Sequence, residues 1–155
     1  MTSLPVLGWR EAVGLPEFGL PSIPAKIDTG ARTSALHATH IQLVEQPGGA
    51  LARFHIDLGH GHETALCEAR HVSRRRITSS NGQSEERLVV TTRLLLGGVL
   101  FDAEFSLTDR SDMLHPVLIG RTALRRRFLV DPSRTFLMSE RTAALTQNPG
   151  SNGPR

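Results

Sequence analysis

Cysteine, lysine and aromatic residues are scarce in this chain of 155 residues, which holds one cysteine, one tryptophan and no tyrosine. The lone Cys67 excludes an internal disulfide and a four-cysteine metal site. No run of about 18 apolar residues is present, which excludes a membrane-spanning helix. Residues 1–10 also lack the layout of a secretory signal. We therefore expect a cytoplasmic protein without a membrane partner.

Positive charge comes almost entirely from arginine, and acidic residues nearly balance it. The 18 basic residues include a single lysine, Lys26, and stand against 15 acidic residues, so the net charge is +3. Two arginine clusters occur, at residues 74–76 and 125–127. Such clusters can contact an acidic peptide or a nucleic acid, but aromatic residues make up only 5% and provide no stacking platform for bases. We favour a solvated arginine face and expect no nucleic-acid partner.

Short strand-like segments dominate the hydrophobic pattern. They predict strands at residues 6–13, 23–27, 35–44, 51–58, 72–78, 87–92, 101–107, 117–119 and 135–138. Turn signals separate them, and Asn81-Gly82 is the strongest hairpin signal among these. One helix is predicted at residues 122–128, with Thr122 as its N-cap. The pattern predicts a mainly β domain of barrel or sandwich type, spanning residues 1–144, followed by a disordered tail at 145–155.

The segment Asp28-Thr29-Gly30 carries the clearest chemical signal. It directly follows the predicted strand 23–27, so the carboxylate lies at a strand end. The threonine hydroxyl can hydrogen-bond to another backbone, and glycine lets a second strand or carboxylate approach closely. By itself the tripeptide predicts no more than a turn. Further along the chain, however, the apolar strand 117–119 is followed by Gly120, Arg121 and the predicted helix.

The order of these features resembles that of the retropepsin-like aspartic proteases. More closely, the chain from Gly8 to Phe136 resembles a bacterial family described as ATP-dependent zinc proteases, which is associated with RimK-type glutamate ligases. The motifs that carry this resemblance are residues 25–37 (AKIDTGARTSALH), 79–82 (SSNG) and 118–124 (LIGRTAL). The resemblance implies a retropepsin-like closed β-barrel, as in the acid proteases, with one short C-terminal helix.

The resemblance also implies an aspartic-type endopeptidase. Its catalytic residues would be Asp28, Thr29 and Gly30, and its substrate-binding residues would be Ala31, Asn81, Gly82, Ile119 and Gly120. Two adjacent carboxylates share one proton, so one accepts a proton from water while the other donates to the scissile carbonyl. Because one Asp-Thr-Gly is present, a second copy must supply the other carboxylate, which predicts a homodimer.

The resemblance also suggests how substrate would be held. The hairpin around Asn81-Gly82 would close over it as a flap, with the turn at residues 47–49 as the other candidate flap. The substrate would be a peptide or protein. The association with glutamate ligases suggests a glutamate-rich tail, which the arginine clusters could attract.

Two features depart from the retropepsin pattern or compete with it. Asp57-Leu58-Gly59 is a second Asp-X-Gly, but we reject it as an internal partner because leucine supplies no hydroxyl. Arg32 stands where retropepsins commonly carry an acidic residue that pairs with the arginine after the second motif. Arg121 therefore needs another partner, for which we consider Asp109, Asp112 or a carboxylate across the dimer.

The sequence gives no direct support for zinc or ATP. It contains neither a His-Glu-x-x-His motif nor a phosphate-binding loop, so we assign no metal ligands and expect no cofactor. We expect His60 and His62 to be exposed turn residues, His37 to be a structural imidazole, and Cys67 to be an unreactive thiol. Two other functions remain open: a non-catalytic β-barrel binding module, and a metal-dependent hydrolase that uses Asp28 with nearby histidines.

Overall fold

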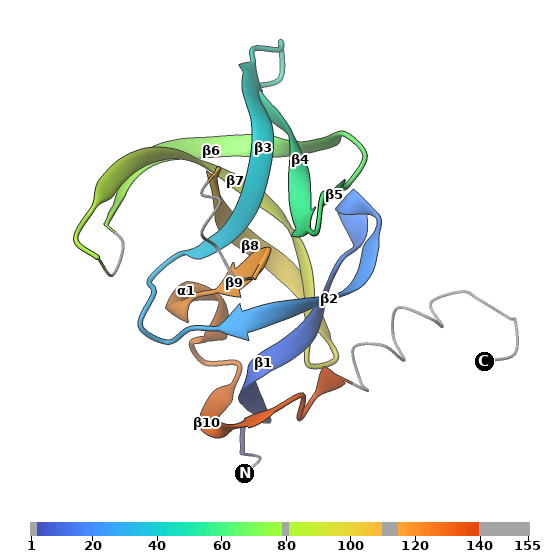
Figure 1. Cartoon of the computed structure of the whole chain (residues 1–155), viewed down its shortest axis with the longest axis vertical. Helices are drawn as coiled ribbons and strands as arrows, with labels where there is room; N and C mark the ends of the chain where they lie inside the picture. The colour runs from blue at the N-terminus through green and yellow to red at the C-terminus, as the bar shows by residue number, and fades with distance from the viewer. Residues whose placement is uncertain (1–2, 79–80, 110–114, 140–155) are drawn as a thin grey trace, which may run out of the picture.

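The computed structural model describes residues 3–78, 81–109 and 115–139, and these form one sheet of ten strands (Figure 1). The elements in chain order are β1 (Val6–Leu15), the 3-10 turn η1 (Pro16–Phe18), β2 (Leu20–Ile27), β3 (Ser34–Val44), β4 (Leu51–Gly59), β5 (His62–Glu63), β6 (Cys67–Thr78), β7 (Ser84–Leu96), β8 (Val99–Thr108), β9 (Val117–Ile119), α1 (Arg121–Leu124) and β10 (Leu129–Thr135). The predicted mainly β fold with one short α-helix is confirmed.

The sheet curls around a single hydrophobic core. Its strand order is β10-β1-β2-β9-β3-β8-β7-β6-β4-β5, and two further pairings, β1–β7 and β3–β4, join strands that are distant in this order. Side chains alternate along each strand, so that on β4 Ala52, Phe54 and Ile56 are fully buried while their neighbours are not. Burying each large apolar side chain contributes about 1.5–3 kcal/mol to folding.

The short strand β9 places the two motifs side by side. It lies between β2, to which it is parallel, and β3, to which it is antiparallel. Ile27 of β2 pairs with Ile119 of β9, and both side chains are buried. Because parallel strands point the same way, the residues that follow them, Asp28 and Gly120, emerge at the same edge of the core.

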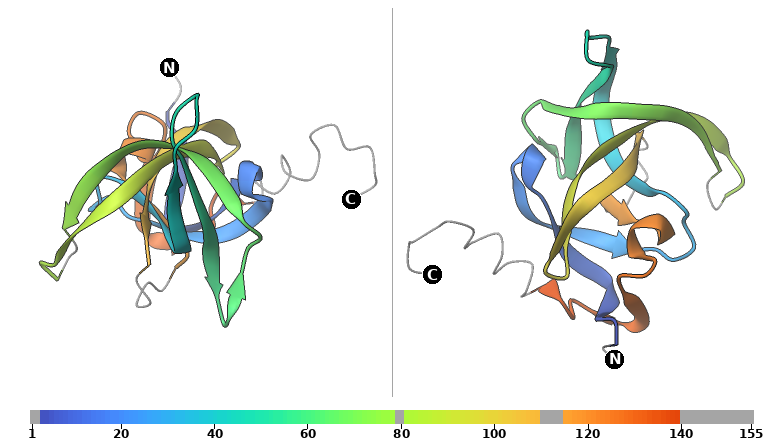
Figure 2. Two further views of the ribbon diagram at one scale, coloured as in Figure 1. Left: turned by 90° about the horizontal axis from the view of Figure 1, so that it is seen from above. Right: turned by 180° about the vertical axis from the view of Figure 1, so that it is seen from behind.

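Strands β6 and β7 extend beyond the rest of the sheet as a two-stranded arm. In the described residues, 84–88 of β7 pair with 74–78 of β6, whereas β7 pairs with β8 only from Val89 onward. We call residues 74–78 and 81–88 the arm. It arches on the same side of the molecule as the loop between β2 and β3, while the β3–β4 hairpin projects at the far end (Figures 1 and 2).

The C-terminal elements differ from the sequence prediction. The helix spans Arg121–Leu124 instead of residues 122–128, its N-cap is Gly120 instead of Thr122, and Arg126 has a left-handed φ of 69° that helical backbone does not allow. The predicted strand at 135–138 is wrong, because parallel pairing with β1 recruits Leu129–Thr135 as β10.

Some predictions concern residues that the structure does not describe. The predicted tail at 145–155 and the predicted domain end at 144 both lie outside the described residues. Each helix found in residues 3–78, 81–109 and 115–139 falls short of the length and apolar character needed to cross a bilayer.

Candidate active site

Asp28 begins the loop that connects β2 to β3, and local hydrogen bonds hold its carboxylate. Its backbone N–H donates to the carbonyl oxygen of Ile119 at 2.8 Å, and its own carbonyl accepts from the N–H of Ala31 at 3.2 Å. Its Oδ1 accepts from the N–H of Gly30 at 2.9 Å, as in an aspartate turn. The Asp28 side chain is 28% exposed, so it is both oriented and accessible.

Gly30 and Lys26 lie next to the Asp28 carboxylate and determine its steric and electrostatic surroundings. A Cβ on Gly30 would lie 3.2 Å from Asp28 Oδ1, so glycine leaves the turn uncrowded. The ammonium of Lys26 lies 3.9 Å from Asp28 Oδ2, and both side chains are partly exposed. Water screens an ion pair of this kind, which therefore contributes little to folding stability.

Residues that follow Gly120 bind the carbonyl oxygens of the Asp28 loop. Arg121 Nη1 donates to the carbonyl oxygens of Thr29 and Gly30, each at 3.1 Å. The backbone N–H of Arg121 donates to the carbonyl of Ala31 at 2.7 Å, and that of Thr122 donates to the carbonyl of Arg32 at 3.2 Å. The start of α1 thus fixes the path of the whole loop.

These contacts give Arg121 partners that the sequence did not indicate, while Asp112 and a carboxylate across the dimer stay predictions. Among the residues that the structure describes, the Arg121 guanidinium donates hydrogen bonds to backbone carbonyls and forms no ion pair with a carboxylate. Asp109 instead lies 4.0 Å from His37, and Asp112 lies outside the described residues. A carboxylate does not need to stand at position 32 in this arrangement, because carbonyl dipoles replace it.

Gly120 is required where the two motifs meet. A Cβ at this position would lie 2.7 Å from the carbonyl carbon of Thr33 and 2.9 Å from the carbonyl oxygen of Ala31, closer than real Cβ contacts. Its N–H donates to the Oγ of Ser34 at 3.0 Å. The close approach of β9 to the Asp28 loop therefore depends on glycine at this position.

The structure brings most of the predicted site residues together. The group at the end of β2 and β9 consists of Asp28, Thr29, Gly30, Ala31, Ile119 and Gly120. Asn81 and Gly82 belong instead to the turn of the arm, where Asn81 Oδ1 accepts from the N–H of Gln83 at 3.1 Å and Gly82 has a φ of 86°. The predicted hairpin is confirmed. The roles of all these residues in catalysis and substrate binding stay predictions.

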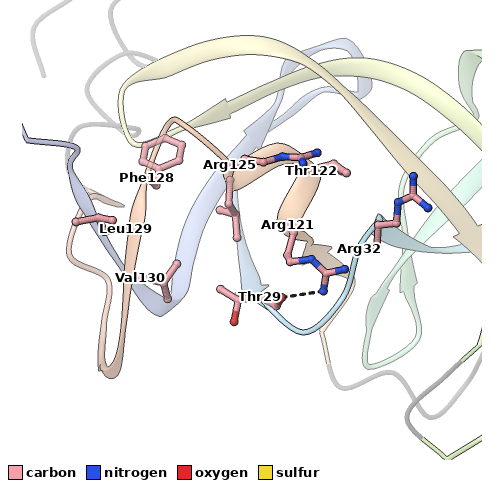
Figure 3. Close-up of a pocket in the computed structure, with 9 residues that line it drawn as sticks. Thr29, Arg32, Arg121, Thr122, Arg125, Phe128, Leu129 and Val130 are labelled. Carbon is pink, nitrogen blue, oxygen red and sulfur yellow. Dashed lines mark hydrogen bonds between the residues drawn. The ribbon is translucent and has the colours of Figure 1, made fainter.

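A basic cleft adjoins the loop and was not predicted from the sequence. It has a volume of about 620 Å³, begins at Thr29 and contains the side chains of Arg32, Arg121 and Arg125 (Figure 3). Its other lining residues are Thr122, Leu124, Phe128, Leu129 and Val130. The sequence signal for this cleft is the arginine cluster 125–127, of which Arg125 lines the cleft and is exposed.

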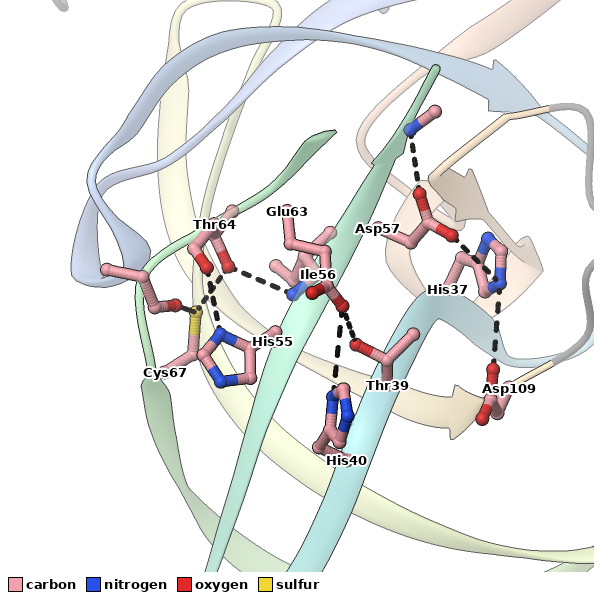
Figure 4. Close-up of polar contacts among 12 residues, drawn as sticks. His37, Thr39, His40, His55, Ile56, Asp57, Glu63, Thr64, Cys67 and Asp109 are labelled. Atoms are coloured by element: carbon pink, nitrogen blue, oxygen red, sulfur yellow. Dashed lines mark hydrogen bonds and ion pairs between the residues drawn. The ribbon is translucent and has the colours of Figure 1, made fainter. Parts of the chain in front are cut away.

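His37 lies away from Asp28, as the registers of β2 and β3 with β9 show. Its side chain is buried, and its Nε2 lies 3.8 Å from Asp57 Oδ2 and 4.0 Å from Asp109 Oδ1 (Figure 4). Its backbone N–H donates to the carbonyl of Pro116, which precedes Gly120 by four residues. His37 is level with Pro116, just before β9, and Asp28 is level with Gly120, just after it, so at about 3.3 Å per residue the two lie roughly 13 Å apart along the strand direction. Asp57 shares that distant position, which agrees with its rejection as an internal partner.

The other histidines near the loops occupy exposed positions, and Cys67 is buried. His60 and His62 are exposed, as predicted, and His40 lies 3.9 Å from Glu63 (Figure 4). Within the described ranges, no group of three or more histidine, cysteine, aspartate or glutamate side chains could hold a metal ion. Burial raises the pKa of the Cys67 thiol, although a hydrogen bond with Thr64 opposes the shift, as expected of an unreactive thiol.

Comparison with known proteins identifies the family. The model of the RimB-like family, described as retropepsin-like aspartic endopeptidase RimB, matches residues 6–141. A relative from Shewanella pealeana, named "Probable alpha-L-glutamate ligase", is 38% identical over 138 residues, which cover 88% of this chain and 30% of the relative. A relative of the same name from Desulfotalea psychrophila is 34% identical over 137 residues, which cover 87% of this chain and 30% of the relative. The chain thus spans about 30% of the length of the curated relatives it matches.

A solved structure shows the same fold. A protein of unknown function from Legionella pneumophila superposes with a TM-score of 0.75 at 29% identity, covering 88% of this chain and 99% of that one. The expected retropepsin-like family and its link to glutamate ligases are confirmed, whereas the zinc protease description of the resembling family is not. The chain belongs to the RimB-like family of retropepsin-like aspartic endopeptidases.

Proposed function

We propose that this chain is an aspartic-type endopeptidase of the retropepsin type that hydrolyses peptide or isopeptide bonds as a homodimer. One observation carries the proposal. The Asp28 carboxylate is accessible, and its loop is fixed by hydrogen bonds from Gly30, Arg121 and Thr122. A group that moves protons during catalysis needs a fixed position together with access to substrate, and this arrangement supplies both.

The second carboxylate comes from the partner copy. Asp57 is the other candidate in an Asp-X-Gly sequence, and its position beside His37, whose N–H binds Pro116 before β9 begins, supports a source outside this chain. Thr29 is exposed in this loop, and a two-fold axis beside it would bring the loops of two subunits together. The site is therefore half complete in each subunit.

The chemistry follows from two carboxyl groups that share one proton. The ionised Asp28 accepts a proton from a water molecule as the water oxygen bonds to the scissile carbonyl carbon. The protonated Asp28 of the other subunit donates its proton to the carbonyl oxygen. When the tetrahedral intermediate collapses, the C–N bond breaks and the amine leaves with the proton that Asp28 took from water. A hydroxyl group of the intermediate returns its proton to the other carboxylate, which restores the shared proton.

The arm acts as the flap in this proposal, within a retropepsin-like closed barrel. The pairings β1–β7 and β3–β4 support barrel closure. Of the two candidate flaps, the arm arches on the side of the Asp28 loop, whereas the turn at 47–49 projects at the far end (Figures 1 and 2). A lid over the site would hold the substrate and exclude surplus water.

We propose an acidic chain, rich in glutamate, as the substrate. Arg32, Arg121 and Arg125 line the cleft that begins beside the loop, and guanidinium groups bind carboxylates through paired hydrogen bonds. Relatives that contain this domain as about 30% of their length are named for a glutamate ligase, which supports glutamate as the recognised residue.

The test compares hydrolysis by the wild type, Asp28→Asn and Asp57→Asn. The substrates are a peptide with a glutamate tail and the same peptide with a glutamine tail. We expect cleavage of the glutamate peptide by the wild type and by Asp57→Asn, and its loss in Asp28→Asn. Activity that survives in Asp28→Asn would refute the mechanism, and equal cleavage of both peptides would refute the substrate class.

Sedimentation and inhibitors address the remaining parts of the proposal. Hydrolytic activity should be found in the sedimenting fraction that contains the dimer, and a chelator should not reduce this activity. An active monomer would overturn the shared site, and loss of activity with a chelator would favour a metal-dependent hydrolase. Binding of the glutamate peptide without any cleavage would favour the non-catalytic binding module.

A further inference from the structure

A chain of buried polar contacts joins the base of the arm to the Asp28 loop. Arg87 on β7 is only 9% exposed, and its Nη1 donates to the Oγ of Ser106 on β8 at 3.3 Å. Ser106 Oγ donates in turn to the carbonyl oxygen of Ser34 on β3, also at 3.3 Å. Ser34 Oγ accepts from the N–H of Gly120 at 3.0 Å. The contacts thus run from β7 to the residue that precedes Arg121.

Arg87 lies where the arm leaves the body of the sheet. The β7–β8 ladder begins at Val89 paired with Ser106, and from Leu88 outward β7 pairs with β6 among the described residues. Arg87 Nε donates to Glu85 Oε1 at 2.6 Å, and Thr108, the last residue of β8, donates to the same oxygen at 2.8 Å. Both side chains of this ion pair therefore hold the arm to the end of β8.

Polar groups form this contact chain although the region around it is buried. Ser34 and Ser106 are fully buried, as is nearly all of the Arg87 side chain. Arg87 Nε pairs with Glu85, whose side chain is 44% exposed, whereas Arg87 Nη1 reaches the fully buried Ser106 Oγ, so this guanidinium links the accessible side of the arm to the interior of the sheet. Hydrogen-bond networks between rigid elements are one physical route by which two distant sites are energetically coupled.

We propose that Arg87 is a positioning residue that couples the arm to the Asp28 loop through Ser106 and Ser34. When the arm changes position, Arg87 moves the Ser106 hydroxyl, and the shift reaches Gly120 and the Arg121 contacts that hold the loop. This coupling does not depend on whether the protein hydrolyses peptides. Its consequence for catalysis, a link between flap closure and the placement of Asp28, rests on the proposed function.

The coupling is tested first without substrate, by amide hydrogen exchange on the intact protein. The variants are Arg87→Met and Ser106→Ala, with Arg74→Met as the control, because Arg74 pairs with Glu86 within the arm and both side chains are exposed. We expect exchange at residues 28–34 and 118–122 to rise about tenfold in both test variants, with residues 6–13 and the control unchanged. Unchanged exchange at residues 28–34 in a folded variant would overturn the proposal.

A double variant and kinetics complete the test. Because both residues belong to one contact chain, Arg87→Met and Ser106→Ala together should raise exchange no more than either alone, whereas multiplied effects would overturn the coupling. If Arg87→Met does not fold, hydrogen exchange at residues 28–34 in Ser106→Ala alone tests the coupling. For a wild type that hydrolyses peptides, Ser106→Ala should lower kcat about tenfold with KM within twofold. Absence of hydrolysis in the wild type would refute the proposed function and leave the exchange result to decide the coupling.

Discussion

The guanidinium of Arg121 lies 3.1 Å from the carbonyl oxygen of Gly30, although 91 positions separate the two residues in the chain. A cation thus satisfies the backbone of the loop that carries Asp28, and a second contact of equal length reaches Thr29. Hydrogen bonds with one charged partner contribute about 1.5–3 kcal/mol when they are shielded from water, and less at an exposed side chain.

We predict that Arg121→Ala lowers the free energy of unfolding by about 1–2 kcal/mol, because the carbonyls of Thr29 and Gly30 lose their donor. Urea denaturation measures this loss. Arg121→Lys should recover only part of it, since one ammonium cannot reproduce the planar guanidinium geometry. A variant as stable as the wild type would show that the contacts are not formed in solution.

Gly120→Ala should be strongly destabilising, because its Cβ would lie 2.7 Å from backbone atoms of Thr33 that cannot move independently. We expect a loss of about 2 kcal/mol or more, within the range found for overpacked sites. Gly48→Ala is the matched control, since a Cβ there meets nothing within 4 Å. Thermal unfolding measures both variants, and an equal effect of the two would contradict the close approach of β9 to the loop.

The buried carboxylate of Glu11 holds the C-terminal segment against β1. It accepts hydrogen bonds from the N–H groups of Gly8, Leu137 and Met138 and from the hydroxyl of Ser139, at 2.7–3.0 Å. In Glu11→Gln the amide group would face two of these donors with its own N–H groups, leaving them unsatisfied. We predict a loss of about 3 kcal/mol in unfolding free energy.

The control for Glu11 is Glu45→Gln, which changes an exposed carboxylate near the end of β3. Urea denaturation should find this variant within about 0.5 kcal/mol of the wild type, as for most surface substitutions. If Glu11→Gln is equally neutral, the segment at residues 136–139 does not depend on this carboxylate.

Stability should fall in mild acid through His115. Burial lowers the pKa of His115, and the positive charges of Arg10 and Lys26 lower it further. The folded protein therefore favours the neutral imidazole. The stabilisation is complete above the unfolded pKa of about 6.5 and is lost as pH falls through the lower folded pKa.

Proton NMR of the His115 ring measures that pKa directly, and Lys26→Gln should move it upward because one repelling charge is removed. His115→Gln should flatten the decline of stability below pH of about 6.5. A His115 that titrates at its ordinary value in the wild type, with no response to Lys26→Gln, would contradict the inferred environment.

Local sequence patterns predicted most of the strands and the position of Asp28 in the candidate site. Period-two alternation and glycine turns locate the strands, and the hairpin at Asn81-Gly82 follows from short-range backbone preferences. Asp28 at the end of β2 was likewise a local prediction, because an apolar strand directly precedes it. Such signals act between residues that are neighbours in the chain, so a sequence displays them.

Other features depend on contacts between distant segments. The parallel pairing of β10 with β1 selected residues 129–135 as the final strand, against a local pattern that favoured residues 135–138. The carbonyl partners of Arg121, the basic cleft and the burial of the Arg87 side chain against Ser106 of β8 arise in the same way. The residues by themselves determined a β domain with a carboxylate at a strand end. Only the tertiary structure decided which groups surround that carboxylate, because hydrogen bonds and burial depend on distance in space.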